Sequence, residues 1–334
     1  MIVKTLRSGS VVRQALLILL PVLTAMLPAY RRGVAIIQPE ESSVIFMWLS
    51  QWIVTLPGYV QHLVLTLLIF LNILFIARVG KLIGIVKGKI PMQYFFATFV
   101  VLMLPSNVAI HPPLVAMLLF IPALISILSA SGSRNSGVRI FNAGFLLSVA
   151  TLVAHPLLLM IPGFFLVLMA SRFYRWNYWA MLASGLALPW IYVVALGWVF
   201  SWYPGPGLYA ATGIYLSGIK YFAEFLKASL PVSSVVAISA MAIMLIPAMF
   251  TIFSRLDQKV IAERYLYRAM LWLFLFAIPV MVVAGGSVQY LSFAGFFVVI
   301  LLSEYILTLR RTLIVDIILG VMLIIGIFGH LHLF

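Results

Sequence analysis

The sequence contains very few charged residues and no cysteine. Only 8% of its 334 residues are Asp, Glu, Lys or Arg, whereas a water-soluble domain of this length has about a quarter. The lack of cysteine excludes disulfides, thiol catalysis and thiolate metal sites. The sequence also lacks the motifs of P-loop and dinucleotide-binding folds, zinc proteases and serine hydrolases. These absences exclude the common classes of soluble enzyme that such motifs identify.

Apolar residues dominate the chain instead. Hydrophobic residues make up 65% of the sequence, and the mean hydropathy is +1.20. Apolar stretches recur along the chain, many of them close to the length needed to cross a hydrocarbon core about 30 Å thick. We therefore predict an all-α, polytopic membrane protein with about 11 transmembrane helices, at residues 15–30, 60–77, 92–107, 114–130, 141–156, 157–170, 178–200, 234–254, 270–285, 290–309 and 312–330.

The charge balance is strongly basic, with 21 Lys and Arg against 7 Asp and Glu, a net charge of +14. Cytoplasmic loops of membrane proteins collect Lys and Arg, so this excess indicates topology rather than a nucleic-acid partner. With the N-terminus inside and the C-terminus outside, the basic residues alternate between loops as this rule requires. The exceptions are Arg31, Arg32, Lys220 and Lys227. We expect a multi-pass protein of a bacterial cytoplasmic (inner) membrane.

Two outward connections, about residues 31–59 and 201–233, are long. The first contains "VIFMWLSQWIVTL", in which five apolar residues share one helical face and Ser50 and Gln51 point elsewhere: Ile45, Trp48, Leu49, Trp52 and Ile53. The second contains "IYLSGIKYFAEFLKASLP", which has a similar amphipathic pattern. Trp and Tyr favour the boundary between lipid and water, so we predict a surface helix in each loop.

A His-Pro pair occurs at two predicted outward turns. "AIHPPLVAMLLFIP" contains His111 and "VAHPLLLMIP" contains His155, and an apolar run ending in Ile-Pro follows each pair. The helices that flank these turns are short, and proline favours a sharp reversal. Short paired helices with polar turns can open a cavity on one face of a membrane protein. They also occur as ordinary packed hairpins, and the sequence leaves both interpretations open.

Two adjacent carboxylates, Glu40 and Glu41, lie in "IIQPEESSV" in the first outward loop. They either neutralise Arg31 and Arg32 or serve a functional site. In a site, a carboxylate can act as a general base, or both can bind a divalent cation, Mg²⁺ or Mn²⁺, that contacts a lipid diphosphate. The four outward cations, Arg31, Arg32, Lys220 and Lys227, are then candidates to bind phosphate.

This layout resembles the GT-C superfamily of polyprenyl-phosphate-dependent glycosyltransferases. The matching elements are "QPEESS" with "VIFMWLSQWIVTL" in the first loop, the short His-Pro hairpins, and "IYLSGIKYFAEFLKASLP" after the seventh span. The resemblance covers about residues 1–255, which form a GT-C-like transmembrane module. Residues 256–334 then form C-terminal transmembrane helices. It implies that Glu40 and Glu41 are catalytic or metal-binding, and that the protein binds a polyprenyl-phosphate-linked sugar. His111 and His155 would then line the cavity from below.

The stretch "FNAGFLLSVATLVAHP", followed by "SRFYRWNYWAMLASGLALPWIY", is also similar to an uncharacterised family of inner-membrane proteins from Bacteroidota. That family implies no activity. The alternative function is therefore a non-catalytic integral-membrane scaffold, a subunit of an envelope or secretion complex with a membrane-protein partner. The scarcity of carboxylates favours this alternative, and the paired glutamates favour the glycosyltransferase.

Overall fold

The computed structural model describes residues 34, 36, 44–82, 109–131, 133–199, 232–255, 261–284, 288–309, 316, 317 and 320. In these ranges the chain is almost entirely helical, and the one β-type interaction is an isolated bridge. The helices are α3 (Val44–Val54), α4 (Gly58–Leu82), α6 (Pro112–Leu128), α7 (Ser136–Val153), the 3-10 helix η2 (His155–Leu159), α8 (Met160–Ala170), α9 (Trp176–Val199), α11 (Val232–Arg255), α12 (Ile261–Val283) and α13 (Val288–Thr308).

Four segments within these helices are long and apolar enough to cross a membrane: Gly58–Val79, Ser136–Val153, Trp176–Val199 and Arg264–Val283. Much of their surface is not covered by protein, and large apolar side chains such as Phe70, Ile191 and Trp198 are exposed. Water would disfavour such a surface, whereas lipid tails accept it. The chain is therefore a helical membrane protein, as the composition predicts.

Each predicted span that falls within the described ranges coincides with a helix, whereas the predicted spans 15–30 and 92–107 lie outside them. The last predicted span, 312–330, is described at only three positions, all helical. The helices after both His-Pro pairs are short, as the sequence predicts. Residues Pro112–Leu128 and His155–Ala170 form apolar helices of fewer than 18 residues, and the second begins with the 3-10 helix η2.

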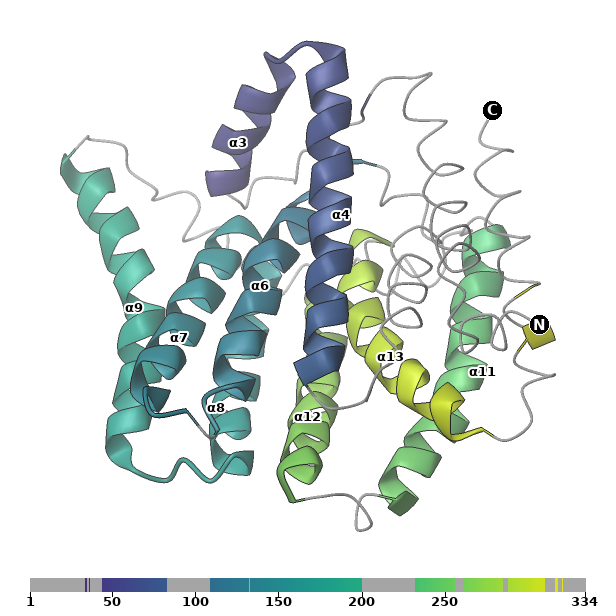
Figure 1. Ribbon diagram of the computed structural model, residues 1–334. Coiled ribbons are helices and arrows are strands. Elements are labelled where there is room, and N and C mark those ends of the chain that lie inside the picture. Colours follow the sequence, from purple (N-terminus) through teal and green to yellow (C-terminus); the bar gives the residue numbers. More distant parts are fainter. Residues whose placement is uncertain are drawn as a thin grey trace.

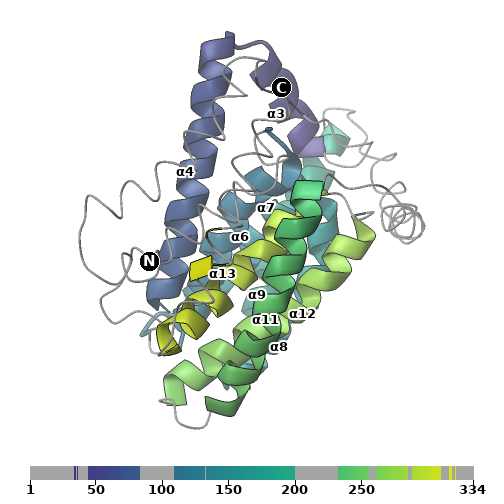
Figure 2. The ribbon, with the colours of Figure 1, turned by 90° about the vertical axis from the view of Figure 1, so that its right-hand side faces the viewer.

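The helices pack in two connected groups (Figures 1 and 2). In the first group, α7 packs between α6 and α9, and α4 covers another side of α6. In the second, α12 packs against α8 and α13, and α13 also contacts α11 and α6. Figure 1 shows that α4 and α9 extend above the upper ends of α6 and α7. The upper ends of α6 and α7 therefore lie below the tips of α4 and α9.

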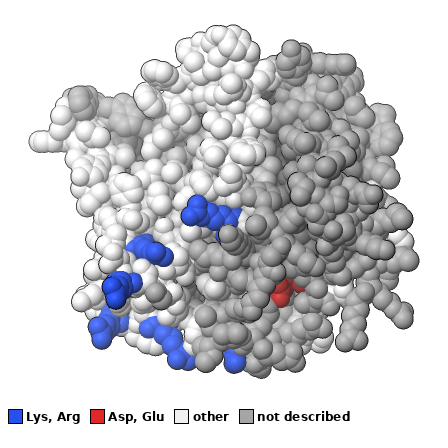
Figure 3. All heavy atoms as spheres, in the orientation of Figure 1, with Lys and Arg blue, Asp and Glu red and all other residues white. Residues whose placement is uncertain are grey.

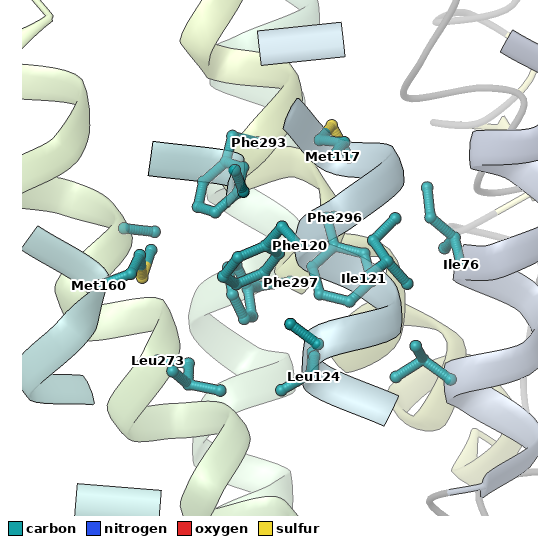
Figure 4. Close-up of a cluster of buried hydrophobic side chains, with 14 of the residues drawn as sticks. Ile76, Met117, Phe120, Ile121, Leu124, Met160, Leu273, Phe293, Phe296 and Phe297 are labelled. Carbon is teal, nitrogen blue, oxygen red and sulfur yellow. The ribbon is translucent and has the colours of Figure 1, made fainter. Parts of the chain in front are cut away.

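A cluster of buried aromatic rings joins the two groups (Figure 4). Phe120 of α6 lies at its centre, and its ring centroid is 4.6 Å from that of Phe293 and 5.8 Å from that of Phe164. Phe296 and Phe297 complete the cluster from α13, with edge-to-face geometry. Pairs in this geometry contribute about 0.5–1.5 kcal/mol beyond the burial of their area. The cluster therefore holds α6, α8 and α13 in a fixed arrangement.

Glycine allows α7 and α9 to approach closely. A Cβ atom added to Gly144 would lie 2.5 Å from the carbonyl oxygen of Leu182, and one added to Gly185 would clash with the carbonyl oxygen of Phe141. At the same interface, the Ser148 hydroxyl donates a hydrogen bond of 2.6 Å to the carbonyl oxygen of Leu186. Small residues and interhelical hydrogen bonds of this kind are how membrane helices associate without a hydrophobic driving force.

The described arginines gather at one side of the helical bundle. Arg134 and Arg139 flank the α6–α7 connection, Arg172 and Arg175 lie in the α8–α9 connection, and both connections are at the lower end in Figure 1. Arg172, in the left-handed region at φ 62°, lies over the ring of Tyr265 at 5.0 Å, which brings the start of α12 to the same side. In Figure 3 the Lys and Arg atoms that are coloured lie in the lower half of the face.

Candidate functional site

His111 begins the first short helix. Its backbone is extended, at φ −138° and ψ 157°, and its Nδ1 accepts a hydrogen bond of 3.1 Å from the backbone N–H of Leu114. This satisfies one of the free N–H groups at the helix start, and Pro112 and Pro113 have no N–H that needs a partner. His111 is fully buried, and this burial lowers its pKa from 6.5 to about 3. The ring is therefore neutral and acts as a helix cap.

Asn72 ties α4 to the same turn of α6. Its Nδ2 donates to the carbonyl oxygen of Leu114 at 3.1 Å and to that of Leu68 at 2.9 Å. Leu114 thus accepts from Asn72 through its carbonyl group and donates to His111 through its N–H. The two polar side chains, both fully buried, fix the first turn of α6 against α4.

Ile36, in the first predicted outward loop, pairs with the residue before His111. Ile36 and Ile110 form the isolated parallel bridge, and Val34 and Ile36 also pack against the buried apolar core. Ile110 directly precedes His111, so the bridge joins the first predicted outward loop to the first His-Pro turn. The sequence separates these segments by more than 70 residues and gives no indication that they meet.

His155 lies where the chain changes direction between α7 and α8. α7 ends at Val153, Ala154 is extended at φ −138° and ψ 97°, and His155 starts η2. The side chain is 6% exposed, and among the described residues its Nδ1 has no hydrogen-bond partner. A buried polar atom without a partner costs about 1–3 kcal/mol. This nitrogen therefore needs a partner that the described chain does not supply.

The packing of α7 and α9 sets the aromatic neighbour of His155. The two helices run in the same direction, so that Ser148 contacts Leu186 and, beyond the end of α7, His155 faces Trp190, one turn further along α9. The centroids of the His155 and Trp190 rings are 6.1 Å apart, and their planes make an angle of 79°. Trp190 is only partly buried, unlike the imidazole. An imidazole with an unused nitrogen thus borders an indole that is accessible from outside.

A helix forms where the first loop predicts one, α3, and its buried face differs from the predicted apolar face. Trp48 and Trp52 are about 60% exposed, with ring centroids 6.1 Å apart. Phe46, Ser50 and Ile53 are buried instead. Ser50 was expected to point away from the apolar face, and it can be buried because its hydroxyl donates to the carbonyl oxygen of Met47 at 2.8 Å. The two indoles and the buried residues therefore lie on different faces of this helix.

Most of the predicted site residues lie outside the part of the chain that the structure describes: Glu40, Glu41, Arg31, Arg32, Lys220 and Lys227. His111 and His155 are described, and both lie at the starts of the short helices after the predicted outward turns. Within the described ranges, no three His, Asp or Glu side chains come together in a way that could hold a metal ion. A divalent cation remains a prediction that depends on Glu40 and Glu41.

Sequence reasoning missed Asn72 and Trp190. Asn72 interrupts the apolar run "LLIFLNILFIA", and Trp190 follows Pro189 in the interior of α9. A single polar residue in a membrane helix signals a buried contact or a functional site, so Asn72 could have been found. Trp190 gave no such signal, because a large aromatic residue in an apolar helix is ordinarily a packing or lipid-facing side chain.

Comparison with known proteins finds no match. No family model, no curated protein and no solved structure is similar to this chain.

Proposed function

We propose that this protein is a GT-C-like membrane protein of cell-envelope glycan assembly. It binds a polyprenyl-phosphate-linked sugar and transfers the sugar on the outer face of the bacterial cytoplasmic membrane. The observation that carries the proposal is the bridge between Ile36 and Ile110, because it joins the loop of the paired glutamates to the first His-Pro turn. In the GT-C-like arrangement that the sequence resembles, His111 and His155 line the cavity that the glutamates face, so the bridge agrees with it.

The bridge limits how far the carboxylates can be from that turn. Glu40 and Glu41 follow Ile36 by four and five residues, and a chain of five residues extends at most about 18 Å. They precede α3, which begins at Val44, by only a few residues as well. The short chain between the bridge and α3 therefore allows the glutamates to reach both the first His-Pro turn and α3, which supports a role at one common site.

The distribution of charge supports the orientation. The described arginines lie at the side of the α6–α7 and α8–α9 connections, and the His-Pro turns lie at the other ends of α6, α7 and α8. Cytoplasmic loops are enriched in Lys and Arg, so the arginine side is the cytoplasmic one in our proposal. The His-Pro turns, α3 and the glutamates then face outward. The N-in, C-out arrangement with about 11 spans agrees with this orientation.

The proposed reaction is a sugar transfer in which a carboxylate acts as the general base. A carboxylate of Glu40 or Glu41 accepts the proton of the acceptor hydroxyl. The acceptor oxygen bonds to the anomeric carbon, and the bond from that carbon to the phosphate oxygen breaks. The electron pair of this bond stays on the phosphate, which leaves as polyprenyl phosphate. Arg31, Arg32, Lys220 and Lys227 are the candidates to stabilise the charge of the leaving phosphate.

The test is complementation of a deletion strain with the double variant Glu40→Gln/Glu41→Gln. Gln keeps the size of each side chain and removes its basic oxygen. We expect loss of one envelope glycan, measured by gel and mass spectrometry, at an unchanged protein level in the membrane. The matched control is Glu263→Gln, at the start of α12 on the arginine side, which should restore the glycan.

Full restoration by the double variant would remove the catalytic assignment. If such a variant also co-purifies a stable membrane-protein partner, the scaffold alternative gains the support that the transferase loses.

A further inference from the structure

The two His-Pro turns are alike in sequence but differ in their unused hydrogen-bonding capacity. His111 uses Nδ1 to cap α6, and its contacts are those of a structural residue. His155 lies at the start of η2 with its Nδ1 buried and, within the described chain, without a partner. Buried polar atoms are nearly always hydrogen-bonded in native proteins. The partner of His155 therefore comes from outside these residues.

A hydroxyl group suits this nitrogen best. In neutral histidine, Nδ1 is either a donor or an acceptor, depending on the tautomer. A hydroxyl can donate one hydrogen bond and accept others, so it matches both tautomers, whereas a phosphate oxygen can only accept. The described arginines that could attract a phosphate are at the far end of α8, roughly 25 Å away along η2 and α8. The surroundings thus favour a neutral ligand with hydroxyl groups.

Trp190 supplies the second half of such a site. Its ring is nearly perpendicular to the imidazole, with centroids 6.1 Å apart, and it is partly accessible. An indole face packs well against the C–H groups of a sugar ring, while an adjacent polar atom binds one of the sugar hydroxyls. Binding sites commonly combine aromatic walls with a few orienting polar groups in this way.

We propose that His155 and Trp190 bind the sugar of the lipid-linked donor, with Nδ1 of His155 hydrogen-bonded to a sugar hydroxyl. This assignment rests on the proposed function and deepens it, because it separates sugar recognition from phosphate recognition. The sugar is then a neutral one with a free hydroxyl, and His111 has no direct part in binding it.

The experiment compares carriers with and without sugar on the full chain in lipid nanodiscs. The probes are farnesyl phosphate and four farnesyl-phosphate glycosides, carrying glucose, galactose, mannose or N-acetylglucosamine. Affinities are measured by microscale thermophoresis for the unaltered protein, His155→Phe and Trp190→Phe. His155→Phe keeps a buried ring and removes both nitrogens. The matched controls are His62→Phe on α4 and Trp198→Phe, an exposed tryptophan on the same helix as Trp190.

We expect at least one glycoside to bind about tenfold more tightly than farnesyl phosphate, since tenfold corresponds to one well-placed hydrogen bond. His155→Phe should abolish this margin, and Trp190→Phe should reduce it, without change in the affinity for farnesyl phosphate. Both controls should keep the margin.

Two results would overturn the assignment while leaving the proposed function in place. One is that farnesyl phosphate binds and no glycoside binds more tightly than it does. The other is an affinity margin that His155→Phe leaves unchanged, which would make water or another part of the chain the partner of Nδ1. A third result, in which no carrier binds at all, would refute the proposed function and this assignment with it.

Discussion

The close approach of α7 and α9 gives the sharpest prediction about the scaffold. In Gly144→Ala the new Cβ would lie 2.5 Å from the carbonyl oxygen of Leu182, where an ordinary contact begins at about 3.4 Å. That oxygen belongs to the backbone, so it cannot rotate away as a flexible side chain could. The helices must therefore separate locally by about 0.9 Å, the difference between these two distances.

The net change in stability combines two losses and one gain. A gap of 0.5–1 Å loses roughly a quarter to a half of each dispersion contact across the interface. The hydrogen bond from Ser148 to Leu186, now 2.6 Å, would stretch toward 3.5 Å and lose about 1 kcal/mol. The higher helix propensity of alanine returns about 0.5–1 kcal/mol. We expect a net destabilisation of about 2 kcal/mol, within the range of roughly 1–3 kcal/mol for overpacked cores.

The assay is thermal unfolding of the purified protein in detergent, followed by helix content. The matched control is Gly58→Ala at the start of α4, where an added Cβ meets no atom within 4 Å. This control should be neutral or slightly stabilising, because alanine restricts the unfolded chain. A Gly144→Ala variant that melts at or above the temperature of the unaltered protein would show that α7 and α9 do not pack this tightly.

Three further variants test the polar contacts around the first His-Pro turn. Asn72→Ala should lower stability by about 1–3 kcal/mol in thermal unfolding, because Leu114 loses a buried donor; an unchanged midpoint would contradict the tie between α4 and α6. His111→Leu should lower stability by about 1 kcal/mol, because the helix cap is lost. His111→Asn should retain most of the stability that the cap contributes, and equal losses in the two variants would argue against capping. The pH dependence follows from the pKa of His111, about 3 when folded. The unfolded chain takes up a proton below pH 6.5, so the stability that His111 contributes above pH 6.5 should fall by about 2 kcal/mol by pH 5. His111→Asn should reduce the pH slope accordingly, and identical slopes would refute this.

The positions of the helices could be predicted from the sequence because apolar length is a direct physical requirement for crossing a bilayer. Their ends could not. α12 begins at Ile261, nine residues before the predicted span, because Glu263, Arg264 and Arg268 occupy its first turns. Hydropathy locates only the part of a helix that contacts lipid. The helix itself extends into water as far as its backbone hydrogen bonds continue, so its ends cannot be read from hydropathy.

The candidate site could be predicted only as a set of residue types. Both histidines were recognised from the His-Pro repeat, yet one caps a helix and the other has an unused nitrogen. This difference depends on which backbone groups and rings fold against each turn, and Trp190 is 35 residues from His155 in sequence. The burial of Ser50 was not predicted, because a serine that bonds to its own helix can be buried among apolar neighbours.

The isolated bridge at Ile36 and Ile110 has a mechanical consequence. A β-ladder transmits position through many successive hydrogen bonds, whereas a single pair fixes a chain at one point only. The side chains of Val34 and Ile36, packed on the apolar core, add to the restraint at these two positions. Changing the shape of the side chain at position 110 should therefore shift Val34 and Ile36 while the helices stay folded.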